Sequence, residues 1–160
     1  MLMHKFLILR KRSLTVGEIR LAHAIFADHL DLKSICIYAH RLIIKHYAIS
    51  PNGHIYFNIA DWCDDFSTQS IEKQSWLIHE LVHVWQYQQG IKLIRKGIFE
   101  RKYQYVLQQG KQFLHYGIEQ QAQMVQDYFL KKHYRQDCDD LAACIPFVSR
   151  NNYDLSQSSK

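Results

Sequence analysis

Glycine, proline and long apolar runs are scarce in this sequence of 160 residues, which contains six glycines and two prolines. So little of either residue excludes a collagen-like repeat and a disordered linker protein. The longest apolar stretches, such as residues 6–9, fall far short of the ~18 residues of a membrane span. Because that stretch precedes Arg10, Lys11 and Arg12, it lacks the charge order of a secretory signal. The sequence predicts one soluble domain that is made in the cytoplasm, or one exported without a cleaved signal.

Cysteine pairs with metal-ligand spacing are also missing. The cysteines at positions 36, 63, 138 and 144 form no CxxC pair, which argues against a four-thiolate zinc site and a thioredoxin-like motif. We expect buried free thiols rather than a disulfide such as Cys138–Cys144.

The net charge of +5 is compatible with nucleic acid, with an anionic surface or with simple solubility. Cations gather between Lys92 and Lys102. No recognised nucleic-acid motif accompanies them, so we expect a solvated face and no nucleic-acid partner.

Isoleucine-rich and tyrosine-rich segments in the first half predict a small sheet. Residues 34–39 and 42–48 are typical of strands, and residues 54–59 follow the turn Ser50-Pro51-Asn52-Gly53. We expect residues 42–59 to form a hairpin.

We expect one helix before the strand segments in the sequence and further helices after them. Apolar residues at helical spacing predict a first helix over residues 16–30 and a last one over residues 112–133. The strongest helical pattern covers residues 70–89, where Glu72 lies in the first turn and Gly90 supplies a stop. The order of elements predicts an α+β fold with about three strands. We place the domain at residues 13–135, between an N-terminal extension (1–12) and a C-terminal tail (136–160).

The helix predicted over residues 70–89 contains the pattern H-E-x-x-H at His79, Glu80 and His83. Four residues make about one helical turn, so both imidazoles project from one face and can bind one metal ion. Glu80 is placed to act as general base on a water at that metal. Apolar neighbours keep the surroundings dry, which strengthens metal binding. We predict one Zn²⁺ per chain; the alternative is a hydrogen-bonded histidine pair on a core helix.

A catalytic zinc ion needs a third protein ligand and an open position for water. Only two glutamates follow the motif, and the first, Glu100, lies among cations that suit a surface role. Glu119 lies on the last predicted helix, where the small Ala122 would allow a close approach to the motif helix. If buried there, Glu119 would need a partner such as a metal. As the third ligand we rank Glu119 first, ahead of His115, Glu100 and Asp127. The alternative is that the Glu119 side chain faces solvent and binds no metal.

The pattern His79-Glu80-Leu81-Val82-His83 followed by Glu119-x-x-Ala122 resembles the compact gluzincin branch of the zincin metallopeptidases. It is most similar to the Vgr-related or Rhs-associated zincin-like domains found with bacterial type VI secretion systems. The resemblance spans about residues 13–133 and implies a zincin-like fold, with an H-E-x-x-H active-site helix and a second helix that carries a glutamate ligand. Further supporting stretches are Gly53–Phe57, Val84–Gln86 and Tyr103–Tyr105.

One position departs from the family pattern. Larger gluzincins carry an aspartate four residues after the ligand glutamate, and here that residue is Gln123. The partner that orients a zinc histidine must therefore be another group, with Asp127, Asp61 or a backbone carbonyl as candidates.

The oxyanion of an amide hydrolysis needs a hydrogen-bond donor beside the metal. We rank His115 and Tyr116 first for this catalytic role. The resemblance implies that the strand 54–59 is an edge strand beside the metal, where an extended substrate could pair with its backbone. The alternative is an edge that is simply exposed and blunted by His54 and Asn58. Other candidate donors are Tyr103, Tyr105 and Tyr128.

Together these features predict a zinc metallopeptidase or amidase in which His79, His83 and Glu119 hold the metal and Glu80 is the base. The resemblance implies a secretion-associated toxin effector that cleaves cell-wall peptide or protein in the periplasm of a target cell. Its partners would be an immunity protein or a secretion-spike protein. The alternatives are a non-catalytic zincin-fold adaptor and a resident cytoplasmic metallopeptidase.

Overall fold

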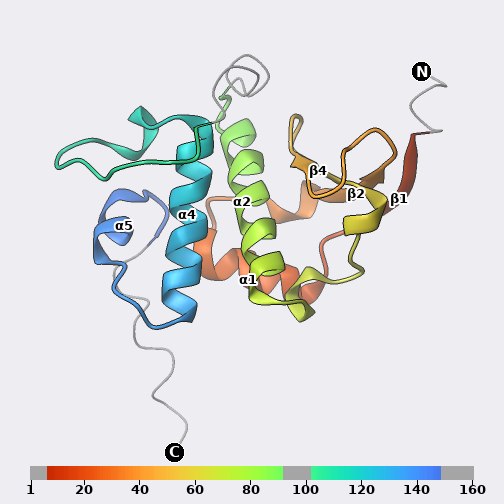
Figure 1. Cartoon of the computed structure of the whole chain (residues 1–160), viewed down its shortest axis with the longest axis horizontal. Helices are drawn as coiled ribbons and strands as arrows, with labels where there is room; N and C mark the ends of the chain where they lie inside the picture. The colour runs from red at the N-terminus through yellow and green to blue at the C-terminus, as the bar shows by residue number, and fades with distance from the viewer. Residues whose placement is uncertain (1–6, 92–101, 149–160) are drawn as a thin grey trace, which may run out of the picture.

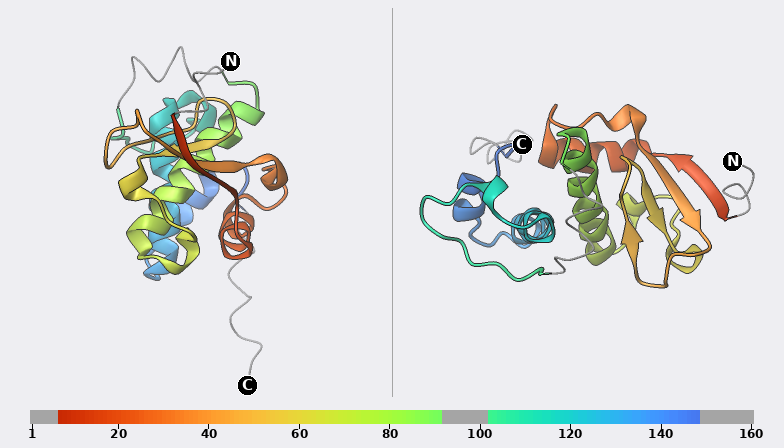
Figure 2. Two further views of the ribbon diagram at one scale, coloured as in Figure 1. Left: turned by 90° about the vertical axis from the view of Figure 1, so that its right-hand side faces the viewer. Right: turned by 90° about the horizontal axis from the view of Figure 1, so that it is seen from above.

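The computed structural model describes residues 7–91 and 102–148. In these residues a four-stranded sheet and four α-helices form an α+β fold, which confirms the predicted class. Helix α2 lies in the middle, with the sheet on one side and α4 and α5 on the other (Figures 1 and 2). The strands are β1 (Ile8–Ser13), β2 (Cys36–His40), β3 (Ala48–Ile49) and β4 (Ile55–Phe57), and the helices are α1 (Val16–Phe26), α2 (Ile71–Gln88), α4 (Ile118–His133) and α5 (Asp139–Cys144).

The strand order in the sheet is β1-β2-β4-β3. Strands β3 and β4 pair antiparallel, as the predicted hairpin requires, while β2 and β4 are parallel. The prediction that residues 54–59 form an edge strand is wrong, because β4 lies between β2 and β3, and β3 is the edge.

The strand predicted over residues 42–48 is also wrong for most of its length. Only Ala48 at its end pairs in the sheet, and residues 41–47 form turns. Side chains beyond β4 hold these turns: the Asn58 amide donates to the Ile43 carbonyl, and the Asp61 carboxylate accepts from the His46 backbone N–H. These side-chain bonds take the backbone groups that a strand would have used.

The observed helix bounds agree best with the predicted ones for the helix with the strongest apolar pattern. Helix α2 covers the predicted segment, whereas α1 stops at Phe26 and α4 begins only at Ile118, after a 3₁₀ turn at Phe113–His115. No helix in the described ranges is both long and apolar enough to cross a membrane. All four cysteines are free thiols.

The packed core extends beyond the residues 13–135 predicted for the domain. Strand β1 pairs antiparallel with β2 along residues 8–13, although three successive cations obscure its strand pattern. At the other end, Phe147 is buried and stacks against Phe26, with ring centroids 4.9 Å apart. Its burial brings α5 against α4 and completes the core.

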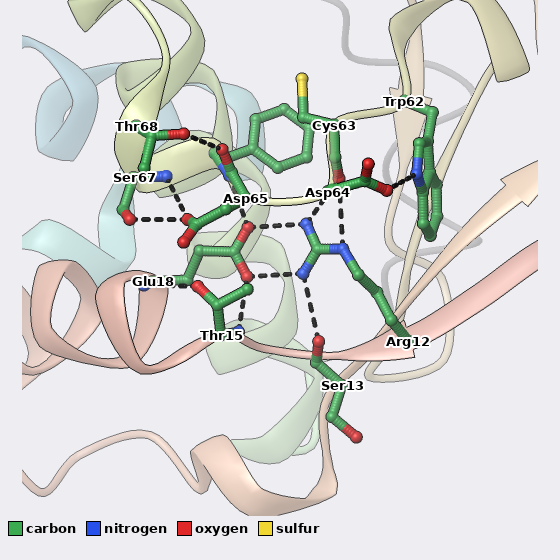
Figure 3. Close-up of polar contacts among 11 residues, drawn as sticks. Arg12, Ser13, Thr15, Glu18, Trp62, Cys63, Asp64, Asp65, Ser67 and Thr68 are labelled. Atoms are coloured by element: carbon green, nitrogen blue, oxygen red, sulfur yellow. Dashed lines mark hydrogen bonds and ion pairs between the residues drawn. The ribbon is translucent and has the colours of Figure 1, made fainter.

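An ion pair between the half-buried Arg12 and the fully buried Glu18 connects β1, α1 and the segment that precedes α2 (Figure 3). The fully buried Glu18 carboxylate accepts two 2.7 Å bonds from the Arg12 guanidinium and one bond each from the backbone N–H groups of Thr15 and Phe66. Arg12 also donates to the Cys63 carbonyl. Because all these groups are satisfied, the charge of Glu18 is tolerated in the interior.

The same junction requires glycine at position 17. A Cβ atom on Gly17 would lie 2.0 Å from the Ser67 hydroxyl oxygen, so only glycine lets α1 approach the 3₁₀ turn Phe66–Thr68 this closely. The ion pair and this close contact together fix the chain just before α2 begins.

We expect Arg12→Lys to lower the free energy of unfolding by about 2 kcal/mol, because lysine cannot bind Glu18 and the Cys63 carbonyl with a planar fork. The matched control is Arg10→Lys on the same strand, where the exposed pair with Asp64 should contribute within about 0.5 kcal/mol. Urea denaturation of the three proteins measures both values. Equal losses of unfolding free energy in the two variants would show that the Arg12–Glu18 pair contributes no more to stability than the exposed Arg10–Asp64 pair.

Candidate metal centre

Helix α2 presents His79 and His83 toward α4. The two helices lie side by side and run in opposite directions (Figure 1). Both imidazoles are buried, with ring centroids 5.1 Å apart. The apolar residues around them on α2, Leu77, Ile78, Leu81, Val82 and Val84, are buried because α2 is enclosed between the sheet and α4.

Glu119 faces these histidines from the first turn of α4. Its Oε2 atom lies 3.3 Å from the Nε2 atom of His79 and 3.3 Å from the Nε2 atom of His83. Ala122, one turn further along α4, is fully buried, which allows the helices to approach closely. The possible ligand atoms of the three residues all lie within 4.8 Å of one another.

The other nitrogen of each imidazole is bound by a glutamine. Nδ1 of His79 lies 3.0 Å from Oε1 of Gln126, and Nδ1 of His83 lies 2.9 Å from Oε1 of Gln86. A carbonyl oxygen only accepts, so each Nδ1 carries a proton and each Nε2 is the nitrogen that faces Glu119.

A relay of amides determines the orientation of Gln86. Its Nε2 donates to the Gln121 side-chain oxygen and to the Ile118 carbonyl, and Gln121 in turn donates to the Tyr116 carbonyl. Every donor in this relay is thereby assigned, which leaves only the Oε1 atom of Gln86 to face His83.

This donor set fits a cation. Two imidazole lone pairs and a carboxylate oxygen converge on one point, and such groups repel one another unless a proton or a metal ion lies between them. Within residues 7–91 and 102–148, no lysine or arginine pairs with Glu119 or with the nearby Glu80. The cluster can therefore hold a metal ion.

A proton on His83 takes the place of a cation in the metal-free protein. Burial disfavours charged His83, but the hydrogen bond to Glu119 and the charges of Glu80 and Glu119 outweigh it and raise the pKa of His83 to about 9. Burial likewise opposes ionisation of Glu119, yet hydrogen bonds from His79 and His83 lower the pKa of Glu119 to about 2. A metal ion must displace this proton from His83 in order to bind.

Glu80, the residue between the ligands in the motif, is also buried. Its Oε2 atom accepts a 2.8 Å hydrogen bond from the hydroxyl of Ser50, which is buried too. Ser50 directly follows the edge strand β3. The sheet edge and the candidate base are thus joined by a single hydrogen bond.

The two residues ranked first as oxyanion donors lie outside this cluster. The Tyr116 hydroxyl binds the backbone of the preceding loop, accepting from Gln108 N–H and donating to the Val106 carbonyl. His115 is exposed on the 3₁₀ turn before α4. Tyr103 lies closer, with its ring centroid 6.1 Å from that of His79. The catalytic role of His115 and Tyr116 stays a prediction.

The alternative third ligands have other positions. Asp127 accepts hydrogen bonds from the Tyr105 hydroxyl and the Gln123 amide. Glu100 lies outside the described residues. Asp61 contacts His46. The Nδ1 atoms of the proposed ligands His79 and His83 are bound by glutamines instead of by either suggested aspartate.

Sequence reasoning missed Ser50, Gln86, Gln121 and Gln126. Gln86 follows His83 by three residues, so the two share one face of α2, and a glutamine inside an apolar helix was the available signal. Ser50 and Gln126 come from distant segments, and their partners are set only by packing.

Two comparisons relate the chain to a known protein, although no protein-family profile matches it. It is 37% identical over 138 residues to the type VI secretion system spike protein VgrG2b of Pseudomonas aeruginosa, a match that covers 76% of this chain and 13% of that protein. It is also similar to the solved structure of the effector domain of Pseudomonas aeruginosa VgrG2b, with a TM-score of 0.73 and 32% identity over 88% of this chain and 84% of the solved one.

The raised pKa of His83 predicts a pH dependence of stability in the metal-free protein. The His83–Glu119 interaction should contribute fully below pH 6.5, the ordinary pKa of histidine, and be lost as the pH rises through about 9. The lowered pKa of Glu119 makes its contribution complete above pH 4.5 and lost as the pH falls through about 2. Urea denaturation in EDTA should therefore show falling stability from neutral to alkaline pH. A Glu119→Gln variant should have a smaller slope, because only the charge of Glu80 and the hydrogen bond to Gln86 would still raise the pKa of His83. The same slope in both proteins would contradict the pairing.

Gln86→Met should weaken metal binding about 10- to 100-fold, because His83 loses the acceptor that orients its ring. The matched control is Gln88→Met on the same helix, where the amide binds Asp31 instead. Competition titration with a chromophoric chelator measures both affinities. Unchanged affinity in Gln86→Met would show that the amide relay does not orient the ligand.

Proposed function

Because the chain belongs to the same family as the effector domain of VgrG2b, we propose that it is a zinc-dependent hydrolase of peptide or amide bonds with a zincin-like fold. The observation that carries the proposal is the convergence of His79, His83 and Glu119 beside a buried Glu80. Two imidazoles and one carboxylate are a ligand set typical of catalytic zinc sites, which keep a further position open.

In this proposal His79, His83 and Glu119 hold the metal, with Gln126 and Gln86 fixing the two imidazoles. Bound zinc supplies Lewis acidity, which makes a water more acidic and polarises a carbonyl. Glu80 accepts the proton of the water that attacks the carbonyl carbon, and then delivers it to the amine as the C–N bond breaks. Its hydrogen bond from Ser50 leaves the second carboxylate oxygen available for this proton.

An oxyanion forms on the carbonyl oxygen during this reaction and needs a donor. Of the five residues considered for that role, Tyr103 has its ring centroid 6.1 Å from that of the proposed ligand His79. We therefore propose Tyr103 ahead of His115 and Tyr116. Tyr103→Phe should lower kcat more than KM, because phenylalanine keeps the ring and loses the donor.

The substrate is proposed to be an extended peptide, from the cell wall or from a protein. Strand β3 is the last strand in the sheet order, so one side of its backbone has no strand partner within the described chain. An extended peptide can pair there, next to Ser50 and Glu80. This replaces the strand 54–59 of the sequence prediction.

The similarity to a type VI spike protein supports a proposal for the setting of the reaction. We propose that the chain is a type VI secretion effector that acts in the periplasm of a target cell, with a spike protein and an immunity protein as partners. Glu80 is present beside the three proposed metal ligands. This disfavours the alternative of a non-catalytic adaptor, because a binding module needs no general base. A resident cytoplasmic metallopeptidase is the remaining alternative.

Replacing the base and a ligand separately tests this function. Glu80→Gln should keep about one zinc per chain and abolish hydrolysis, because glutamine cannot accept a proton, whereas His83→Ala should lose the metal as well. Expression of each protein in the periplasm or the cytoplasm of a bacterium, with metal analysis of the purified chains, gives the readout. We expect toxicity only in the periplasm, absent from both variants.

The control is His23→Ala, which changes an exposed histidine on α1 and should keep metal and toxicity. Full activity of Glu80→Gln would contradict the mechanism. Release of metal by Glu100→Ala but not by Glu119→Ala would identify Glu100 as the third ligand.

A further inference from the structure

The loop of residues 41–49, which joins β2 to β3 and includes β3, exposes large apolar side chains that the proposed chemistry does not use. The exposed fractions are 68% for Leu42, 71% for Ile44, 51% for Tyr47 and 47% for Ile49. Single exposed apolar residues are ordinary, but four within eight positions of one short loop, here called the apolar patch, indicate a binding surface.

This loop is held in place by its neighbours. Asn58 binds the Ile43 carbonyl, and the buried Asp61 accepts from the His46 backbone N–H at 2.6 Å and lies 3.2 Å from the His46 ring. His46 has a φ of +64°, a conformation that non-glycine residues adopt only at a cost. The apolar side chains are therefore displayed by an ordered backbone.

The charges on this loop have one sign. Arg41 and Lys45 are exposed and flank Leu42 and Ile44, and residues 40–50 contain no aspartate or glutamate. The acidic residue that contacts the loop, Asp61, is buried and bound to His46. A binding partner that matches this loop would offer an apolar region to the exposed side chains and negative charges to Arg41 and Lys45.

We propose that the 41–49 loop docks the protein on an anionic lipid bilayer. Aliphatic tips can enter the acyl region, Tyr47 suits the interface, and Arg41 and Lys45 can bind anionic headgroups. Exposed aliphatic side chains flanked by cations, on a loop without acidic residues, are the combination that an anionic bilayer binds. Because Ile49 adjoins Ser50, docking would hold the Glu80 side of the molecule near the membrane surface.

Vesicle co-sedimentation of the whole chain tests this proposal independently of any hydrolase activity. The protein should bind vesicles of phosphatidylglycerol and phosphatidylethanolamine at least about tenfold more tightly than vesicles of phosphatidylcholine, and high salt should remove the difference. The double variant Leu42→Ser/Ile44→Ser should lose at least about tenfold in affinity. Arg41→Gln/Lys45→Gln should lose affinity for the anionic vesicles alone.

Val16→Ser is the matched control, since Val16 is 66% exposed on α1 and should not change binding. Circular dichroism and zinc content establish that each variant is folded. Absence of binding to anionic vesicles, or equal binding by Leu42→Ser/Ile44→Ser, would overturn the proposal. Self-association of the wild type that this variant abolishes, without vesicle binding, would assign the loop to a second copy of the chain instead.

Discussion

The position of one carboxylate, that of Glu119, organises this molecule. It lies 3.3 Å from two imidazoles that belong to a different helix, and the three groups repel one another unless a cation or a proton joins them. The packing of α4 against α2 is what brings them together. Binding a divalent ion would relieve that repulsion, so metal binding and the docking of the two helices should reinforce each other.

The groups behind the imidazoles are neutral amides. A carboxylate partner would add negative charge to a site that already contains Glu80 and Glu119. Gln86 and Gln126 orient the rings and fix their tautomers without adding that charge. Since the relay from Gln86 ends on the Tyr116 carbonyl, the chain just before α4 supports the ligand on α2.

The other wall of the site is built by the sheet. Arg12 and Glu18 fix β1 and α1 against the segment that leads into α2, while Ser50 ties the end of β3 to Glu80. The base is therefore held between the motif helix and the sheet edge where a peptide is proposed to pair. The loop before β3 carries the exposed apolar patch, so substrate pairing and membrane docking would share one side of the molecule.

The amino-acid sequence by itself determined the parts that depend on local periodicity. The long helix α2 and the placing of His79 and His83 on one face follow from helical spacing. The turn at residues 50–53 follows from its Pro-Asn-Gly sequence. The choice of Glu119 also came from the sequence, because so few glutamates follow the motif.

Tertiary structure alone decided the rest, because those features depend on residues far apart in the chain. The order of β3 and β4 depends on β4 pairing with the distant β2. Strand β1 is hidden in the sequence by three cations, of which the half-buried Arg12 pairs with Glu18 only in the fold. Ser50, Gln86 and Gln126 are ordinary polar residues until packing supplies their partners. Hydrogen bonds between distant segments leave no periodic signal, so the surroundings of the metal ligands could not be read in advance.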